Sequence, residues 1–469
     1  MLAPDRRPQG WWVVRARRRP CGCRAGASFR RGAPARPRTV GTGRLSVSWG
    51  RIASVATAGG AAGGPGAGAA SGTSVRRVGD DERRARLARR HAVAPGHRVA
   101  DPVEATRSVV VLHATEPATV HLAVHARAEV PRSAVDHALE GERSLVRQLA
   151  MRRTMFVFPR DLLPAAWGSA AARVAATERT RLARDLVAAG LADDGHALLA
   201  QVGEEVLAAL DAAPPGLTTT ELRAVVPAMD VRADLPSSQV GPGRFLTVLG
   251  AEGHLVRGTN TSHWRVFRPR WATMAAWLER VEEPLTAEAG YAALVRCWLE
   301  RFGPGTETDL VWWLGATKGA VRRALADVGA VEVVLGTGAP AYVLADDVEP
   351  EPVVAPWAAL LPVLDPTVMG WKERGFYLGE HGPALFDRNG NAGTTAWWDG
   401  RVVGCWVQDP DGVVEVRLLE DVPAEGRAAL RVEAGRLQTR LAGERVGTVY
   451  PSPAMRADPG DLTYPVLRA

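Results

Sequence analysis

The chain has 469 residues, of which 46% are hydrophobic, enough for about three to four domains of ~100 to 200 residues each. Its formal charge of +7 is unevenly distributed: residues 1–80 contain 15 basic and 2 acidic residues, and the remainder contains 43 basic and 49 acidic residues, a net charge of −6. The basic character alone therefore does not indicate that the folded part binds nucleic acid. No apolar run approaches the ~18 to 20 residues of a membrane-spanning helix, which argues against a membrane protein.

Residues 1–80 are rich in Arg, Gly, Ala and Pro and show no hydrophobic periodicity. Such a composition cannot build a packed core. We interpret this segment as a disordered leader or a translated upstream region, with the folded chain beginning near Val75. A flexible arm that binds polyanions is the alternative.

The sequence contains four cysteines: Cys21, Cys23, Cys297 and Cys405. Their spacing fits neither a disulfide framework nor a zinc site. We therefore expect a reducing, cytoplasmic setting, no metal and no cofactor. His121 and His125 have the i, i+4 spacing of a metal-binding pair, but no third ligand accompanies them. A solvated helix face is the preferred interpretation of that pair.

The pattern of residues 82–197 predicts a first winged helix with connecting helices. The segments with helical composition are 83–93, 102–112, 118–128 and 132–140. Thr115 followed by Pro117 predicts an N-cap with proline in the first turn of the next helix. Two β-rich runs, 144–149 and 154–158, follow with a basic turn between them. Helices followed by a β-hairpin are the element order of a winged helix.

The same element order is repeated twice more. Residues 198–285 combine helical segments with a hairpin, and Thr218 and Glu221 have the spacing of a capping box. Residues 286–350 contain helical segments and then a hairpin with a Gly-rich tip. The repeat lies in the order of elements rather than in residue identity. Three tandem winged helices are the economical interpretation.

The character of the chain changes at residues 351–469. Alternating and aromatic runs are separated by the turn dipeptides Asn389-Gly390, Asp399-Gly400 and Asp411-Gly412, which are hairpin signals. This pattern predicts a small antiparallel β-barrel or sheet from about residue 357 to residue 421, with a closing helix from 423 to 442. The predicted fold is α+β, with three tandem winged-helix domains followed by a small C-terminal β-barrel.

Candidate DNA-binding cations follow from this arrangement, because the third helix of a winged helix is the usual DNA reader. In the third unit, Lys318, Arg322 and Arg323 lie on the helix face opposite the apolar one, where they can meet phosphates. The second unit offers Arg244 on its helix and Arg257 on its hairpin. The alternative is an ordinary solvated helix surface.

Four segments carry a resemblance to a known family. They are LVRQLAMRRTMFVFP (145–159), FGPGTETDLVWWLG (302–315), LLPVLDPTVMGWKERGFYL (360–378) and LFDRNGNAGTTAWWDGRVVGCW (385–406). With the helices and hairpins of residues 82–460, they resemble the winged-helix DNA glycosylases, a group that includes crosslink-unhooking and azinomycin-resistance enzymes. The resemblance implies a concave DNA-binding surface. It also implies excision of alkylated, N7-modified purines from duplex DNA.

The catalytic signature of that family is a pair of polar residues around one apolar residue, commonly two glutamines. The matching positions are His113, Ala114 and Thr115, so neither glutamine is present. The resemblance implies that His113 positions or deprotonates a water and that Thr115 orients it. A local interpretation stays open, with Thr115 as an N-cap and His113 as a helix C-terminal histidine bonded to backbone carbonyls. Glu116 is either a general base or, preferably, a partner of the helix dipole.

The same resemblance implies DNA contacts from the first hairpin and from the C-terminal domain. The hairpin candidates are Arg147, Met151, Arg152 and Arg153, and the C-terminal candidates are Lys372 and Arg374. A basic turn between two strands suits groove entry or phosphate binding. Arg152 and Arg153 are the strongest candidates, whereas a place in the core is the alternative for Met151.

Lysine usage bears on the reaction type. Glycosylases that also cleave the strand form a Schiff base through an amine, and the only lysines in the chain are Lys318 and Lys372. We assign the first to a DNA-facing helix and the second to the barrel entrance. A glycosylase with this sequence is therefore expected to be monofunctional, using water and leaving an abasic site.

Two functions remain open. One is a DNA glycosylase that acts on alkylated bases, and the other is a non-catalytic winged-helix DNA-binding protein or transcriptional regulator without the glutamine pair. A regulator is more often a dimer that reads two half-sites, whereas three units in one chain suit a monomer. We expect double-stranded DNA as the partner, no membrane association, a monomer, and a cytoplasmic location associated with the nucleoid.

Overall fold

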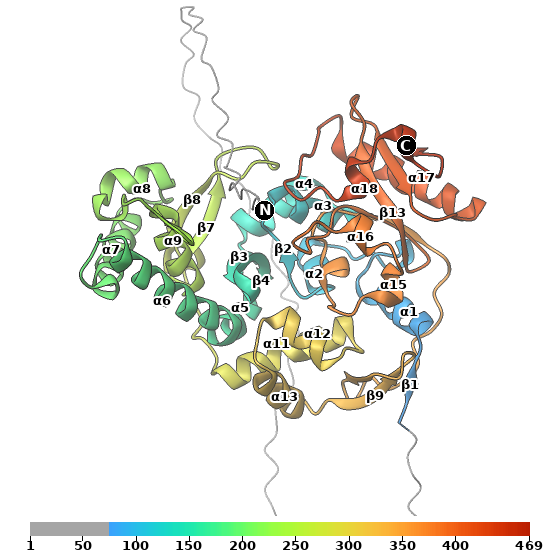
Figure 1. The fold of residues 1–469 in the computed structure, drawn as a ribbon, viewed down its shortest axis with the longest axis horizontal. Helices are drawn as coiled ribbons and strands as arrows, with labels where there is room; N and C mark the ends of the chain where they lie inside the picture. The colour runs from blue at the N-terminus through green and yellow to red at the C-terminus, as the bar shows by residue number, and fades with distance from the viewer. Residues whose placement is uncertain (1–74) are drawn as a thin grey trace, which may run out of the picture. The chain divides into compact units, whose positions relative to one another are not determined.

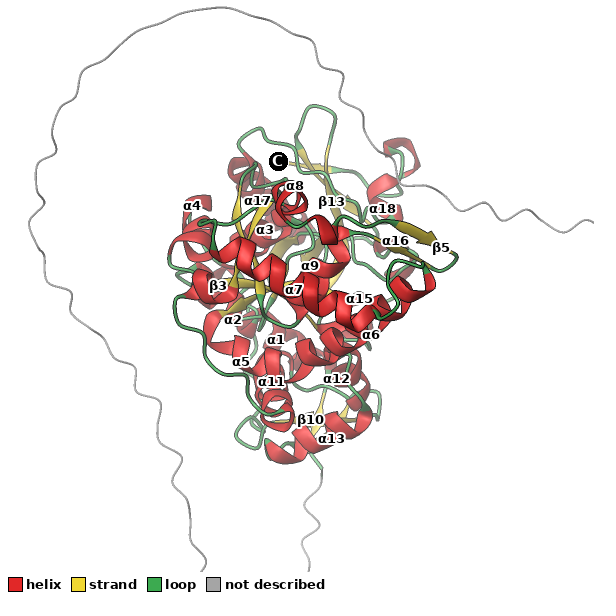
Figure 2. Cartoon of the chain, turned by 90° about the vertical axis from the view of Figure 1, so that its left-hand side faces the viewer, coloured by secondary structure: helices red, strands yellow, loops and turns green. Residues whose placement is uncertain are grey.

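The structure, a computed structural model, describes residues 75–469 (Figure 1). Cys21, Cys23 and most of the expected leader lie outside the described residues. Helices are the main element, and strands occur in short hairpins and in one larger sheet (Figure 2). A mixed α+β fold is confirmed. No helix within residues 75–469 has the length and apolar character needed to span a bilayer.

The first region contains a three-stranded sheet with order β2-β4-β3. Its elements are β1 (Arg77–Val78), α1 (Asp80–Arg90), α2 (Pro102–Arg107), β2 (Leu112–His113), α3 (Pro117–Arg127), α4 (Arg132–Asp136), β3 (Leu145–Ala150), β4 (Thr154–Pro159), α5 (Leu163–Ala166) and α6 (Ala172–Ala188). The predicted hairpin is present as β3 and β4, with Leu145 opposite Pro159 and Ala150 opposite Thr154.

The predicted helix 102–112 is wrong beyond Arg107, where α2 ends. Val110 has a positive φ of 65°, and the next residues form β2, in which His113 pairs with Phe156 of β4. A run of three valines is stiff and favours extended backbone. Pairing with a strand far along the chain therefore outweighs the local helical composition.

The second region has a core of its own. Its elements are α7 (Gly195–Asp211), α8 (Thr219–Val225), β5 (Ala233–Leu235), β6 (Ser238–Val240), α9 (Pro242–Ala251), β7 (Leu255–Asn260), β8 (Pro269–Thr273) and α10 (Met274–Leu278). The capping box of Thr218 and Glu221 is confirmed, with the Glu221 carboxylate accepting from the Thr218 N–H at 2.7 Å. The hairpin β5–β6 was not predicted.

The third region has three helices followed by a hairpin, as predicted. Its elements are α11 (Ala287–Phe302), α12 (Glu307–Leu314), α13 (Lys318–Asp327), β9 (Val331–Leu335) and β10 (Pro340–Val343). The strand β1, from the beginning of the described chain, pairs in parallel with β9. This sheet therefore joins the start of the first region to the hairpin of the third region.

The C-terminal region has an open sheet of order β11-β12-β13-β14-β15. Its elements are β11 (Ala358–Leu361), α14 (Pro366–Met369), α15 (Gly375–Leu378), α16 (Gly382–Leu385), β12 (Thr395–Trp398), β13 (Arg401–Gln408), β14 (Val414–Leu418), α17 (Ala424–Leu441), α18 (Pro453–Arg456) and β15 (Leu467–Arg468). The two edge strands, β11 and β15, do not pair with each other, so the expected closed barrel is not formed. Both are short, and α17 packs against the sheet instead.

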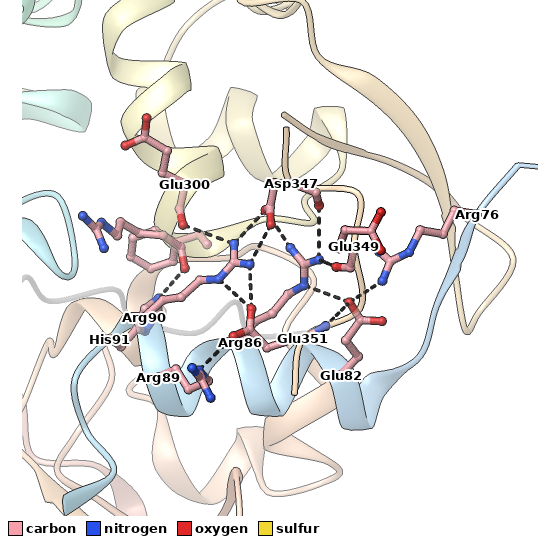
Figure 3. Close-up of polar contacts among 12 residues, drawn as sticks. Arg76, Glu82, Arg86, Arg89, Arg90, His91, Glu300, Asp347, Glu349 and Glu351 are labelled. Carbon is pink, nitrogen blue, oxygen red and sulfur yellow. Dashed lines mark hydrogen bonds and ion pairs between the residues drawn. The ribbon is translucent and has the colours of Figure 1, made fainter. Parts of the chain in front are cut away.

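The largest core runs through the first, third and C-terminal regions, where it includes Leu87, Trp298, Trp371 and Trp397, and extends to the hairpin and α10 of the second region. Helix α1 is fastened to the linker that follows the third region by an ion-pair network (Figure 3). Nη1 of Arg86 and Nη1 of Arg90 both lie 2.7 Å from Oδ2 of Asp347, and Arg90 also bonds Glu351 at 2.7 Å. Because this network is partly buried, it is screened less than a surface pair.

Candidate active site and DNA-binding pocket

The four segments that carried the family resemblance meet at one pocket of about 410 Å³. The first contributes Arg152, the second Trp312, the third Lys372 and Arg374, and the fourth Phe386 with its neighbouring turn. Helices α12, α15 and α16, which carry or adjoin these segments, are labelled in Figure 1. Residues that are far apart in sequence thus build a single cavity.

A buried carboxylate joins two of these segments. Asp309, on α12, accepts hydrogen bonds at 2.8 Å from the backbone N–H groups of Lys372 and Glu373. The same side chain caps its own helix through Thr306. Burial raises the pKa of Asp309, and the backbone donors oppose that rise. Asp309 therefore fixes the position of the segment that presents Lys372 and Arg374 to the pocket.

Two guanidinium groups lie over the ring of Trp312. The Cζ atom of Arg152 is 4.0 Å from the ring centroid, and that of Arg374 is 5.1 Å away. Arg374 also lies 4.6 Å from the ring centroid of Phe386. Such cation–π contacts stabilise each guanidinium by about 0.5 to 2 kcal/mol. Burial, with the neighbouring charge of Arg374, lowers the pKa of Arg152 to about 10, so Arg152 remains charged at neutral pH.

The tip of the β3–β4 hairpin places Arg152 with an unusual backbone. Arg152 and Arg153 have positive φ values of 54° and 59°, which cost roughly 1 kcal/mol each for residues with a side chain. Gly315, at the end of α12, packs against this tip: an added Cβ would lie 3.2 Å from the Cγ atom of Arg152. Close packing against α12 thus maintains the turn.

His113 lies on β2 and pairs with Phe156 of β4, the strand that leads away from the hairpin tip with Arg152. Its side chain is 5% exposed and its ring lies 4.6 Å from that of Phe156. Burial, with the charge of Arg152, lowers the pKa of His113 to about 3. The ring is therefore neutral at pH 7, and its buried Nδ1 has no hydrogen-bond partner within residues 75–469. The expectation of a helix C-terminal histidine bonded to carbonyls is wrong.

Thr115 and Glu116 follow directly. Thr115 is exposed and is not the N-cap of α3, which is Glu116, with Pro117 in the first turn. The N–H of Ala114 donates to the carbonyl of Met155 at 2.9 Å, so the extended pairing of β2 continues past His113. Thr115 itself lies in a bend after β2, and its side chain is exposed whereas that of His113 is buried.

Glu116 bonds the C-terminal part of the chain. Its Oε1 accepts from the hydroxyl of Thr448 at 2.9 Å and from the N–H of Val449 at 2.6 Å. Burial raises the pKa of Glu116, and these two donors oppose the rise. The carboxylate thus connects the start of α3 to residues 448–449.

Two of the expected DNA contacts are buried. Met151 is 0% exposed and belongs to the largest core. Arg147 is 8% exposed, donates to the carbonyl of Gly258 at 3.4 Å and lies over Phe267. Neither side chain is presented to a DNA duplex. Both hold the first hairpin in place, which is the alternative already considered for Met151.

The other expected contacts are distributed over several surfaces. Arg153 is exposed and pairs with Glu178 at 2.9 Å. Lys318 and Arg322 share Glu307, and Arg323 pairs with Asp327. In the second region Arg244 pairs with Asp185 at 2.7 Å, and Arg257 lies over Trp271 at 5.3 Å. The exposed pairs of Lys318, Arg322 and Arg323 are weak, about 0 to 1 kcal/mol, so phosphates can displace their acidic partners. The Arg244–Asp185 pair is largely buried.

His121 and His125 do not lie on a solvated helix face. Nε2 of His121 is 3.4 Å from Oδ1 of Asp136, and the ring of His125 contacts Arg436. Burial, with neighbouring arginines, lowers their pKa values to about 3 and about 2. The described part of the chain contains no group of three His, Cys, Asp or Glu side chains placed to hold a metal.

Trp312 and Asn391 also line the pocket, but neither was predicted as a site residue. Both residues lie in the segments that carried the resemblance, and this was the signal in the sequence that could have identified them. They lie in one pocket because segments far apart in sequence come into contact, and no local sequence pattern predicts such contacts.

Comparisons with known proteins identify the family of the chain. The family described as DNA glycosylase AlkZ-like matches residues 106–440. The chain belongs to the AlkZ-like DNA glycosylase family. Among solved structures, the Streptomyces sahachiroi DNA glycosylase AlkZ has a similar fold, with a TM-score of 0.62 and 20% sequence identity over 79% of this chain and 98% of that one. A comparison with curated protein sequences found no match. The pocket and His113 both lie within the part that matches the AlkZ-like family.

Proposed function

We propose that this chain is a monofunctional DNA glycosylase that excises N7-alkylated purines from duplex DNA by water attack at the sugar. Membership of the AlkZ-like family supports action on DNA bases. The observation that carries the proposal is the neutral, buried His113, whose Nδ1 lacks a partner among the described residues and whose strand pairs with the hairpin that presents Arg152.

His113 is chemically suited to replace a glutamine. A neutral imidazole has one hydrogen-bond donor and one acceptor, and an amide side chain likewise offers both. With a pKa of about 3, His113 is a weak base at pH 7. It would therefore position the attacking water through a hydrogen bond rather than remove its proton before attack. The exposed hydroxyl of Thr115 would form a second hydrogen bond with that water.

The balanced step is a hydrolysis. N7-alkylation leaves a positive charge on the purine, so the base departs neutral when the N9–C1′ bond breaks and its electron pair stays on N9. The water oxygen then bonds to C1′, becomes acidic and releases its proton to solvent. The products are the free base and an abasic site. His113 and Thr115 contribute positioning, which is worth many orders of magnitude when reacting atoms are held in contact.

The proposed DNA-binding surface includes the three expected winged helices and the pocket. The exposed candidates are Arg153, Lys318, Arg322 and Arg323, and the pocket candidates are Arg152, Lys372 and Arg374. Their phosphate contacts would position a duplex without reading its sequence. A monomer suffices, because all of these groups belong to one chain.

Single-turnover excision from a duplex containing one N7-methylguanine tests the proposal. The wild type is expected to release the base, and His113→Ala and Thr115→Ala are each expected to slow release by ~100-fold, a typical contribution of a positioned hydrogen-bonding group. A wild type that binds the duplex but releases no base would favour the non-catalytic DNA-binding alternative. Release at equal rates by all three proteins would place the site elsewhere.

A separate test, based on Lys372, examines whether the glycosylase is monofunctional. This lysine lines the pocket, where an amine could reach an abasic sugar. Borohydride treatment during turnover is expected to trap no covalent protein–DNA adduct. An adduct that disappears in Lys372→Arg would instead establish a Schiff-base mechanism.

A further inference from the structure

We propose that the pocket between Arg152, Trp312 and Arg374 is a dedicated site for one phosphodiester of the DNA strand, adjacent to the nucleotide that is excised. This inference rests on the proposed function and assigns the pocket a single ligand group. Trp312 acts in it as a positioning residue that holds two guanidinium groups toward that phosphate.

The charge of the pocket supports an anionic ligand. Its lining includes Arg152, Lys372 and Arg374 and no carboxylate, although the chain after residue 80 has a net charge of −6. The neighbouring Arg153 pairs with Glu178 at 2.9 Å. Arg152, by contrast, forms no ion pair with any residue in the described range, and its buried Nε has no hydrogen-bond partner there. Like charges gathered in a half-buried site are destabilising unless an anion joins them.

The geometry supports a phosphate in particular. The guanidinium groups of Arg152 and Arg374 lie over Trp312, and their Nη atoms form no hydrogen bond with any residue that the structure describes. These Nη groups can donate paired hydrogen bonds to two phosphate oxygens. Nε of Arg374 is already committed to the carbonyl of Trp371 at 3.0 Å, which fixes the direction of its remaining donors.

The turn that borders the pocket adds polar groups without adding negative charge. Asp387 accepts from the N–H groups of Asn389 and Asn391 at 2.8 and 2.9 Å and from the Asn391 side-chain amide. Its carboxylate is thereby occupied within the turn. Asn389 and Asn391 line the pocket.

The position of Arg152 at the tip of the β3–β4 hairpin supports a phosphate of the reacting strand, because β4 leads from that tip to Phe156, which pairs with His113 on β2. The charge of Arg152 contributes to the lowered pKa of His113, and an uncompensated guanidinium there would oppose the positive charge that develops on the sugar as the base leaves. A phosphate held by Arg152 removes that opposition. Free phosphate has the same chemistry, so the test must separate the two sources.

The test neutralises single phosphates of the N7-methylguanine duplex as methylphosphonates, at each linkage near the lesion in turn. With wild-type protein, one linkage is expected to matter: its neutralisation should slow excision by roughly 10- to 100-fold, the effect of a lost charge-assisted hydrogen bond. In Arg152→Gln and Arg374→Gln the same neutralisation should have little further effect, because the partner is already gone. Arg223→Gln, in the second region, is the matched control and should keep the full wild-type sensitivity.

Trp312 is tested by the same readout. Trp312→Leu is expected to lose the linkage-specific sensitivity, whereas Trp312→Phe retains it, because a ring still supports the guanidinium groups. A purely structural role would lower all rates without changing which linkage matters. Equal sensitivity at every linkage, or full sensitivity in Arg152→Gln, would overturn the phosphate site.

Binding separates this inference from the proposed function. The duplex is also made with a tetrahydrofuran residue at the lesion position, which has no base to lose, and its affinity is measured with the same methylphosphonates. Linkage-specific loss of affinity supports the phosphate site even if no base is ever excised. Excision without such a linkage overturns the site and leaves the glycosylase proposal intact. Binding of millimolar inorganic phosphate that is equal in wild type and Arg223→Gln, is lost in Arg152→Gln and does not compete with the duplex would assign the pocket to free phosphate and overturn the DNA assignment.

Discussion

Arg127 and Asp365 form a bidentate ion pair in which both side chains are completely buried, with N–O distances of 2.9 and 2.7 Å. Arg127 also donates to the hydroxyl of Thr367 at 2.8 Å. Removing one partner leaves a buried, uncompensated charge. Arg127→Met or Asp365→Leu is therefore expected to lower the free energy of unfolding by about 3 to 5 kcal/mol, as measured by urea denaturation. The double variant should be less destabilised than the two losses added together, and strict additivity would contradict the pairing.

The substitution His113→Gln should separate neutral positioning from base catalysis. Because burial lowers the pKa of His113 to about 3, the ring stays neutral across pH 5 to 8. The wild-type single-turnover rate is therefore expected to show no step near the ordinary histidine pKa of ~6.5, and His113→Gln should remain within ~10-fold of wild type. A rate that falls below pH ~6.5 in wild type but not in His113→Gln would show that the histidine titrates during the reaction.

The free energy of unfolding should decrease at acidic pH because of the buried histidines. The pKa values of His91, His113, His121 and His125 are all lowered, primarily by burial. The unfolded chain, with histidine pKa values of ~6.5, therefore binds more protons than the folded chain between about pH 6.5 and 3. Stability is complete above that window and falls as the pH decreases through it, by up to ~1.4 kcal/mol per pH unit for each histidine. Urea unfolding at pH 7 and pH 5.5 isolates this effect from the carboxylates, and an unchanged free energy of unfolding would contradict it.

Glu116 should act through position rather than as a base. Glu116→Gln keeps an oxygen that can accept from Thr448 and Val449, so its excision rate is expected to stay near that of the wild type. Glu116→Ala removes the acceptor and should increase amide hydrogen exchange at Val449 and slow excision by ~10-fold, in line with the loss of about one hydrogen bond. If Glu116→Gln abolished excision while exchange at Val449 remained slow, the general-base role would hold instead.

Local patterns predicted the parts of the fold that depend on neighbouring residues. The capping box of Thr218 and Glu221, the hairpin β3–β4 and the helices and hairpin of the third region all follow from spacing within a short window. The strands β1 and β2 were missed because each has two residues and exists only through a partner far along the chain. The barrel was predicted from turn signals, which specify hairpins but not whether the two edge strands meet.

The residues of the candidate site were named from the family resemblance and not from a local pattern. The structure brings Arg152, Lys372 and Arg374 into one pocket and places His113 on the strand that pairs with β4. Residue type did not distinguish Arg147, which is buried, from Arg152, because both are basic residues of one hairpin. Only the packing of Trp312 against the hairpin tip makes that distinction.

The pairing of β1 with β9, together with the attachment of α1 to Asp347, has a consequence for how the chain acquires its structure during synthesis. Among the described elements, the ribosome produces β1 and α1 first, but their partners emerge only after the whole second region and most of the third. Contacts of such sequence separation form late and slow folding. The first region therefore must wait with apolar surface uncovered, a condition in which nascent chains are prone to aggregate. A fragment that stops before residue 331 lacks both partners, so low solubility is the expected outcome of expressing the first region alone.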